Sequence, residues 1–315
     1  MFKINPNKFE CILLSCEAKL ISKKVNIAYA ATMSAGKTTC INALLGTELL
    51  HSANEATTAT ITEVRLSQRE LIRCYDKNKK IIEEISSITP KKIKELNCND
   101  KINEILIEGK FNFDENFILI DTPGPNNSRD KNHSNLAYDF ILESNFDFLV
   151  YVINSTQPFI NDDVLYLKFI EKNIEHKKII FLVNKLDEFD SENESIDKFK
   201  GNLKGYLNDI GFKNPIIFGV SAYRALLVKK LIFQEKLSKK EKRELLHFLD
   251  QNYDFLDSSF IPFSEEMINE VKNQNRFGFL GESFEDYKYL NEIYCKTGFS
   301  YFEFYLKNET YNLNK

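Results

Sequence analysis

The sequence has little of what several classes of protein require. Its four histidines are isolated and its six cysteines include no C-x-x-C pair, so we expect reduced thiols and no zinc site. No apolar run is long enough to span a membrane, and the stretch 9–20 carries Glu10 and Glu17, which a signal peptide would not. The net charge of -4 argues against a surface built mainly for nucleic acid. We therefore expect a cytoplasmic protein with one large core.

A near-match to the phosphate-binding pattern G-x-x-x-x-G-K-[ST] begins at Ala31, with the letters ATMSAGKT. Such a loop holds phosphates with backbone N–H groups, a lysine and a hydroxyl that ligates magnesium. Gly36, Lys37 and Thr38 stand where these groups are needed, and the apolar run 25–31 predicts the preceding strand. Alanine at position 31 adds only one methyl group if its φ is negative, so we expect a working loop. Further expected nucleotide contacts are Ser34, Ala35 and Thr39.

A second motif ends the apolar run FILIDTPG, residues 117–124. The pattern D-x-x-G after a buried strand fits an aspartate directed toward magnesium and a glycine N–H directed toward a γ-phosphate. We therefore expect Asp121 to ligate magnesium and Gly124 to act at the γ-phosphate.

Two further motifs predict a pocket for the base. The run 177–187 ends in N-K-x-D, in which Asn184 and Asp187 would hydrogen-bond to the edge of guanine. Adenine lacks the donor pair that the aspartate accepts. A third strand ends at Ser221 and Ala222, where a backbone N–H would meet the guanine O6. Four elements in this order, each after a predicted strand, predict a guanine nucleotide site.

The first switch should lie in the threonine-rich stretch 51–67. Magnesium and the attacking water both need a threonine that closes over the γ-phosphate. Thr57, Thr58 and Thr60 compete for this role, while Thr60 and Thr62 alternate with apolar neighbours as in an edge strand. We predict Thr58 as the catalytic and magnesium-binding residue.

Five blocks of the sequence resemble the GTPase domain of bacterial dynamin-like proteins: MSAGKTTCINALLG, ATTATITEV, DTPGPNNSRDKNHS, YVINSTQPFINDD and NKLD. The resemblance covers about residues 20–310. It implies an enlarged α/β P-loop GTPase domain with a mostly parallel sheet flanked by helices. It also implies GTP hydrolysis with magnesium, and a monovalent cation, potassium or sodium, near the phosphate loop. The residues that it places at the site are Ser34, Gly36, Lys37, Thr38, Thr58, Asp121, Gly124, Asn184, Lys185 and Asp187.

The spacing of the motifs predicts how the chain is organised. The long stretch between Lys37 and Asp121 predicts extra strands around a short helix begun at Thr89. Residues 226–249 have helical spacing, and their lysines are expected on a solvated face. We expect an N-terminal neck helix over 1–22, a GTPase domain over 23–295 and a closing neck helix over 296–315. The family's helical stalk is not among these residues, which fits either an excised domain or a protein that stops at Lys315.

Three functions compete at this point. The first is a dynamin-like GTPase that dimerises through its nucleotide face, alone or with a second dynamin-like subunit, and remodels a membrane. It would touch lipid only through parts or partners outside this chain, at the inner face of the membrane. The second is an Era-type GTPase that acts on ribosomes or RNA, although no basic module is visible. The third is a slow nucleotide-dependent interaction module, which Ala31 and Met33 would permit.

Water activation is open in all three readings. Pro125 follows the D-x-x-G motif, where a Ras-like protein has the glutamine that orients water. Ser34, the backbone near Thr58 and the monovalent cation are candidates for this role, whereas Arg129 is expected to form a solvated salt bridge.

Overall fold

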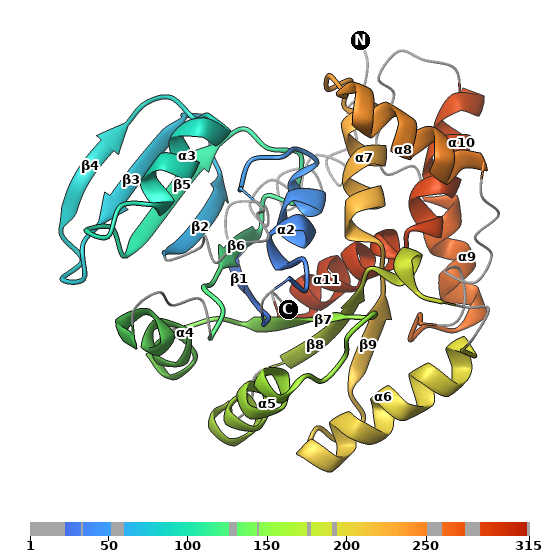
Figure 1. The fold of residues 1–315 in the computed structure, drawn as a ribbon. Helices are drawn as coiled ribbons and strands as arrows, with labels where there is room; N and C mark the ends of the chain where they lie inside the picture. Colours follow the sequence, from blue (N-terminus) through green and yellow to red (C-terminus); the bar gives the residue numbers. More distant parts are fainter. Residues whose placement is uncertain are drawn as a thin grey trace, which may run out of the picture.

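The computed structural model describes residues 23–32, 34–51, 60–125, 131–143, 145–174, 178–190, 194–250, 260–274 and 284–313. Within these ranges the strands form one nine-stranded sheet in the order β4-β3-β5-β2-β6-β1-β7-β8-β9 (Figure 1). The strands are β1 (Val25–Ala30), β2 (Ile61–Leu66), β3 (Leu71–Tyr75), β4 (Ile81–Ile85), β5 (Glu104–Gly109), β6 (Phe117–Asp121), β7 (Phe148–Asn154), β8 (Lys178–Asn184) and β9 (Ile216–Gly219).

The half of the sheet from β6 to β9 is parallel, and β2, β3 and β4 add antiparallel pairs. Helices cover both faces (Figure 1). They are α2 (Lys37–Leu45), α3 (Pro90–Asn97), α4 (Lys131–Glu143), α5 (Asn161–Asn173), α6 (Ile196–Ile210), α7 (Ala222–Ile232), α8 (Lys239–Asp250), α9 (Glu265–Asn273), α10 (Phe284–Lys296) and α11 (Phe299–Leu313). This mostly parallel α/β architecture confirms the predicted fold class.

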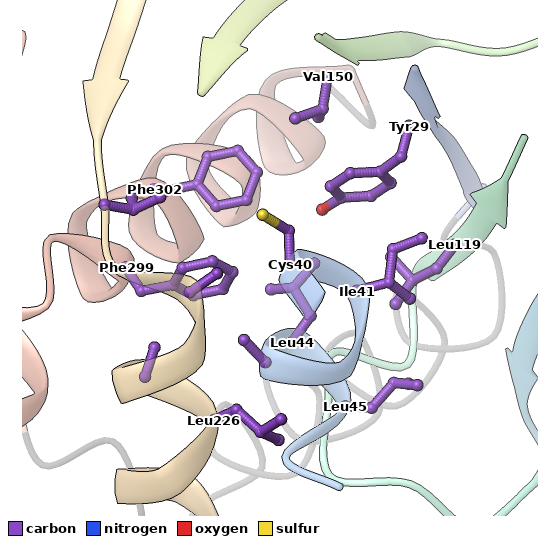
Figure 2. Packing of buried hydrophobic residues seen from close by; sticks show 14 of the residues in the cluster. Tyr29, Cys40, Ile41, Leu44, Leu45, Leu119, Val150, Leu226, Phe299 and Phe302 are labelled. Atoms are coloured by element: carbon purple, nitrogen blue, oxygen red, sulfur yellow. The ribbon is translucent and has the colours of Figure 1, made fainter. Parts of the chain in front are cut away.

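Two buried clusters hold the layers together, one on each face of the sheet. On one face, Ile41 and Leu44 of α2 pack among Leu119 of β6, Leu226 of α7 and Phe299 of α11 (Figure 2). On the other face, α4, α5 and α6 cover β1, β7 and β8. The central strands are buried on both faces, and their residues are accordingly mostly apolar, as in parallel strands generally. The core therefore fixes the strand ends at which the motifs stand.

The predicted expansion of the sheet is present between α2 and β6. It consists of β2 to β5 with α3, whose first residue is Pro90 and whose N-cap is Thr89. The Thr89 hydroxyl accepts a hydrogen bond from the Lys92 N–H at 3.2 Å. One detail of the prediction was wrong: β2 is not an edge strand, because it lies between β5 and β6. Thr60 and Thr62 are consequently buried, and the Thr60 hydroxyl donates to Asn97.

The helical prediction over 226–249 was only partly right, because the helix is interrupted between α7 and α8. Ser238 begins the second helix with a capping box: its hydroxyl accepts from the Glu241 N–H at 3.2 Å, and its own N–H donates to the Glu241 carboxylate at 2.7 Å. The prediction of a solvated lysine face also failed for Lys229 and Lys230, which are buried. Each of these two lysines forms an ion pair there, with Glu303 and Glu241 respectively.

The last helix, α11, packs onto the domain along an apolar stripe. Phe299, Phe302 and Leu306 are buried, and the rings of Phe302 and Tyr305 contact Phe218 of β9. The predicted N-terminal helix over 1–22 lies outside the described residues, so its pairing with this stripe stays a prediction. In the described part of the chain, no helix combines the length and the apolarity needed to cross a membrane.

Candidate nucleotide-binding site

Four loops meet at the carboxyl ends of β1, β6, β8 and β9, where the sequence motifs were expected. β1 leads into α2 on one face of the sheet, whereas β7 leads into α5 on the other face (Figure 1). In parallel α/β sheets, ligands bind in the crevice at such a change of direction. The topology therefore brings the candidate residues to one edge of the sheet.

In the candidate phosphate loop, residues 31–38, two described residues have a positive φ, and one of them is the glycine that the motif requires. Gly36 has φ 88° and directly precedes α2. A Cβ on Gly36 would lie closer than 3.0 Å to the side-chain nitrogen of Asn184, so no other residue fits without displacement. Ala31 is buried and is not among the described residues with positive φ, whereas Ser34 is, at φ 63°. The missing first glycine therefore imposes no backbone strain.

The charged groups at the start of α2 face the end of β6. Lys37 forms a buried ion pair with one carboxylate oxygen of Asp121. The Thr38 hydroxyl donates to the other oxygen at 3.1 Å. A hydroxyl beside a carboxylate fits magnesium, which binds through few protein oxygens and completes its shell with substrate phosphates and water. Within the described ranges, no group of three or more histidine, cysteine, aspartate or glutamate side chains could hold a metal by itself.

Asn184, at the end of β8, joins the phosphate loop to the base loop. Its side-chain nitrogen donates to the Ala35 carbonyl at 3.0 Å, and its side-chain oxygen accepts from the Ala222 N–H at 3.0 Å. The Ser221 N–H donates to the Thr297 carbonyl at 2.9 Å. Both N–H groups that were expected near the guanine O6 are thus engaged within the protein in this structure.

Asp187 and Lys185 follow β8 on the base side of the site. The Asp187 carboxylate pairs with Arg224 of α7, whose Nε lies 3.3 Å from it. The Arg224 guanidinium lies 4.8 Å from the ring centre of Phe248 on α8. Lys185 has φ 65° and accepts a hydrogen bond on its carbonyl from the Ser155 hydroxyl at 2.7 Å. The backbone of this loop is therefore fixed by groups that the motif does not include.

Some predicted site residues cannot be placed. Thr58, Met33 and Arg129 lie outside the described residues. Gly124 and Pro125 are described and buried, and Thr39 is half-buried on α2. Sequence reasoning missed Arg224 and Thr297, because both reach the site through contacts between separate elements and neither belongs to a motif.

Phosphate, magnesium and base motifs at one sheet edge define the class as a P-loop GTPase. A model of the dynamin family matches residues 27–186, about half of the chain. The chain therefore belongs to the dynamin family, and the domain described here is its GTPase domain.

Relatives agree with this membership. The chain is 27% identical over 250 residues to an "Uncharacterized protein in xynA 3'region" of Caldicellulosiruptor sp. (strain Rt8B.4), covering 76% of this chain and 58% of that protein. It is 23% identical over 206 residues to "Dynamin-like protein A" of Bacillus subtilis (strain 168), covering 64% of this chain and 17% of that protein. The chain thus spans less than two thirds of the length of each of these relatives.

Among solved structures, one from an "oligomerised bacterial dynamin pair" that senses and tethers membranes aligns with a TM-score of 0.53 and 20% identity. The alignment covers 84% of this chain and 43% of that one. This likeness supports the fold.

Proposed function

We propose that this chain binds GTP in preference to ATP, hydrolyses it through a nucleotide-dependent dimer, and serves membrane remodelling through parts or partners outside these residues. The observation that carries the nucleotide assignment is the Asn184 side chain, which bonds both the phosphate loop and the base loop. One residue thereby sets the distance between the two halves of the site. A single loop that resembled a motif by chance would not have such a partner.

Each side chain then has a role in the proposed site. Lys37 leaves Asp121 to neutralise the β- and γ-phosphates, because a phosphate offers it more charge than one carboxylate does. Thr38 and Asp121 would hold magnesium, with Thr58 as a further ligand; when bound, the ion offsets charge on the phosphates. Asp187 would accept from guanine, and Asn184 would bond its edge. The remaining proposed contacts are Ser34, Ala35, Gly36, Thr39, Gly124, Lys185, Ser221 and Ala222.

The proposal of a dimer follows from what the site lacks for water activation. Pro125 has no side-chain donor or acceptor at the position where a glutamine would orient water. Ordering the surrounding loops costs about 1–2 kcal/mol per residue in conformational entropy. A second copy that docks across the nucleotide face would offset this cost, with a potassium or sodium ion adding positive charge. The oligomerised bacterial dynamin pair supports this proposal as a structural relative.

The test is turnover of GTP and of ATP by the purified chain over a wide dilution series. We expect turnover of GTP alone, with specific activity that rises with protein concentration and is higher in potassium than in lithium. GDP with aluminium fluoride should trap a dimer in sizing experiments. Lys37→Ala is the control for contaminating activity, since it removes the lysine that neutralises the phosphates.

The outcomes separate the parts of the proposal. Equal binding of ATP and GTP would show that the base assignment is wrong. Flat specific activity, together with a monomer in the presence of GDP and aluminium fluoride, would remove the dimer and leave the GTP site standing.

A further inference from the structure

A buried aspartate outside the four motifs contacts the phosphate loop. The hydroxyl of Thr32, the second residue of the loop, donates to Oδ1 of Asp163 on α5 at 2.7 Å. The hydroxyl of Tyr151 on β7 donates to the same oxygen at 2.7 Å. All three side chains are at least nine-tenths buried. One carboxylate oxygen therefore joins the loop, a central strand and a helix on the opposite face from α2.

The positions of the three residues follow from the fold. Tyr151 lies beside Ala30 in the parallel register of β1 and β7, so its ring stands next to the strand that leads into the loop. Asp163 lies in the first turn of α5, where the helix dipole favours a negative charge. Burial raises the pKa of Asp163, and the hydrogen bonds from Thr32 and Tyr151 oppose that rise. A carboxylate kept in the core at this cost indicates that its two hydrogen bonds matter.

The loop has a second side-chain anchor at its far end. Asn184 holds the Ala35 carbonyl, while Asp163 holds the Thr32 hydroxyl. Between these anchors lie Met33 and Ser34, and Ser34 has the left-handed φ of 63°. The N–H groups of this short span must point inward for the loop to surround a phosphate. The two anchors therefore restrict the backbone at Thr32 and at Ala35, the described residues at the two ends of this span.

We propose that Asp163 is a positioning residue that holds the entrance of the phosphate loop, through Thr32, in the conformation that binds nucleotide. The proposal rests on the proposed function, because it assigns Asp163 to the GTP site. If this anchor is lost, nucleotide binding must itself order the loop. The conformational entropy of each residue ordered would then lower the affinity for nucleotide about tenfold.

The test compares two substitutions that each remove one hydrogen bond from the same oxygen. Thr32→Val keeps the shape of the side chain and removes the bond to the loop, whereas Tyr151→Phe removes the bond to the strand. We expect Thr32→Val to raise the Kd for a fluorescent GDP analogue about tenfold, and Tyr151→Phe to leave it within about threefold. Thermal unfolding of the nucleotide-free variants should show similar losses of stability. A merely structural role for Asp163 would leave both affinities unchanged.

Further variants serve as controls for the loss of this hydrogen bond. Asp163→Asn keeps an acceptor oxygen and Thr32→Ser keeps the hydroxyl, so both should retain affinity near that of the wild type. If Thr32→Val does not fold, Thr32→Ala takes its place, with the same expected loss of affinity. Wild-type affinity in a folded Thr32 variant that lacks the hydroxyl overturns the anchor and leaves the GTP site intact. A wild-type chain that binds no guanine nucleotide overturns both proposals.

Discussion

Replacing Gly36 by alanine tests the geometry of the phosphate loop most directly. At φ 88° an alanine is strained by roughly 1–2 kcal/mol. Its Cβ would also displace the Asn184 amide, which makes one hydrogen bond to Ala35 and accepts one from Ala222. Two hydrogen bonds are worth about 1 kcal/mol each. Together these terms predict that Gly36→Ala lowers the free energy of unfolding of the nucleotide-free protein by about 3 kcal/mol.

Urea unfolding followed by circular dichroism measures this loss, and titration with a fluorescent GDP analogue measures the accompanying fall in affinity. Gly201→Ala is the matched control, because a Cβ there meets no atom within 4 Å and the residue lies inside α6. It should stabilise the protein by about 0.5–1 kcal/mol. A Gly36→Ala variant with wild-type stability and affinity would show that the loop does not approach Asn184 as described.

Three further results are expected. Asp187→Asn should weaken GTP binding about 10–100-fold, because an amide donor then faces the guanine donors. Calorimetric titration should show that this variant prefers xanthosine nucleotides to GTP. The Thr58→Ala variant should bind GDP normally and lose turnover of GTP. The Thr60→Ala variant should keep turnover and lose only stability, because the Thr60 hydroxyl donates to Asn97. An inactive Thr60→Ala variant beside an active Thr58→Ala variant would place the first switch at Thr60. Iodoacetamide should label exposed Cys98 in the folded protein but Cys40 only after unfolding, as read by peptide mass spectrometry, because burial raises the pKa of the Cys40 thiol.

Local patterns were enough to predict most of the framework. Each motif-bearing strand is a mostly apolar run, and α2 and α3 begin where a Gly-Lys pair and a Thr-Pro pair indicate. These signals depend on neighbours in the sequence. The positions of the motif-bearing loops were predictable for the same reason, since each loop directly follows its strand.

The parts that were missed depend on residues far apart in the chain. Lys229 and Lys230 were predicted to be solvated because glutamates interleave with the lysines of residues 226–249. In the fold, Glu303 on α11 and Glu241 on α8 allow them to be buried in pairs. We predicted an edge strand at β2, because nothing in its own residues shows that β5 pairs with its outer side. The contact between Thr32 and Asp163 joins positions 131 residues apart, which no local period encodes.

The place of β1 in the middle of the sheet has a consequence for synthesis of the protein. Val25 pairs with Phe117 of β6, and Ile27 pairs with Phe148 of β7. At the usual rate of about 5–20 residues per second, β1 waits roughly 5–20 s for β6 to be made. The strands β2 to β5 can pair among themselves during that time, because all four lie within residues 61–109. The apolar residues of β1, which lead into the phosphate loop, therefore stay without their sheet partners for longer during synthesis than those of β2 to β5 do.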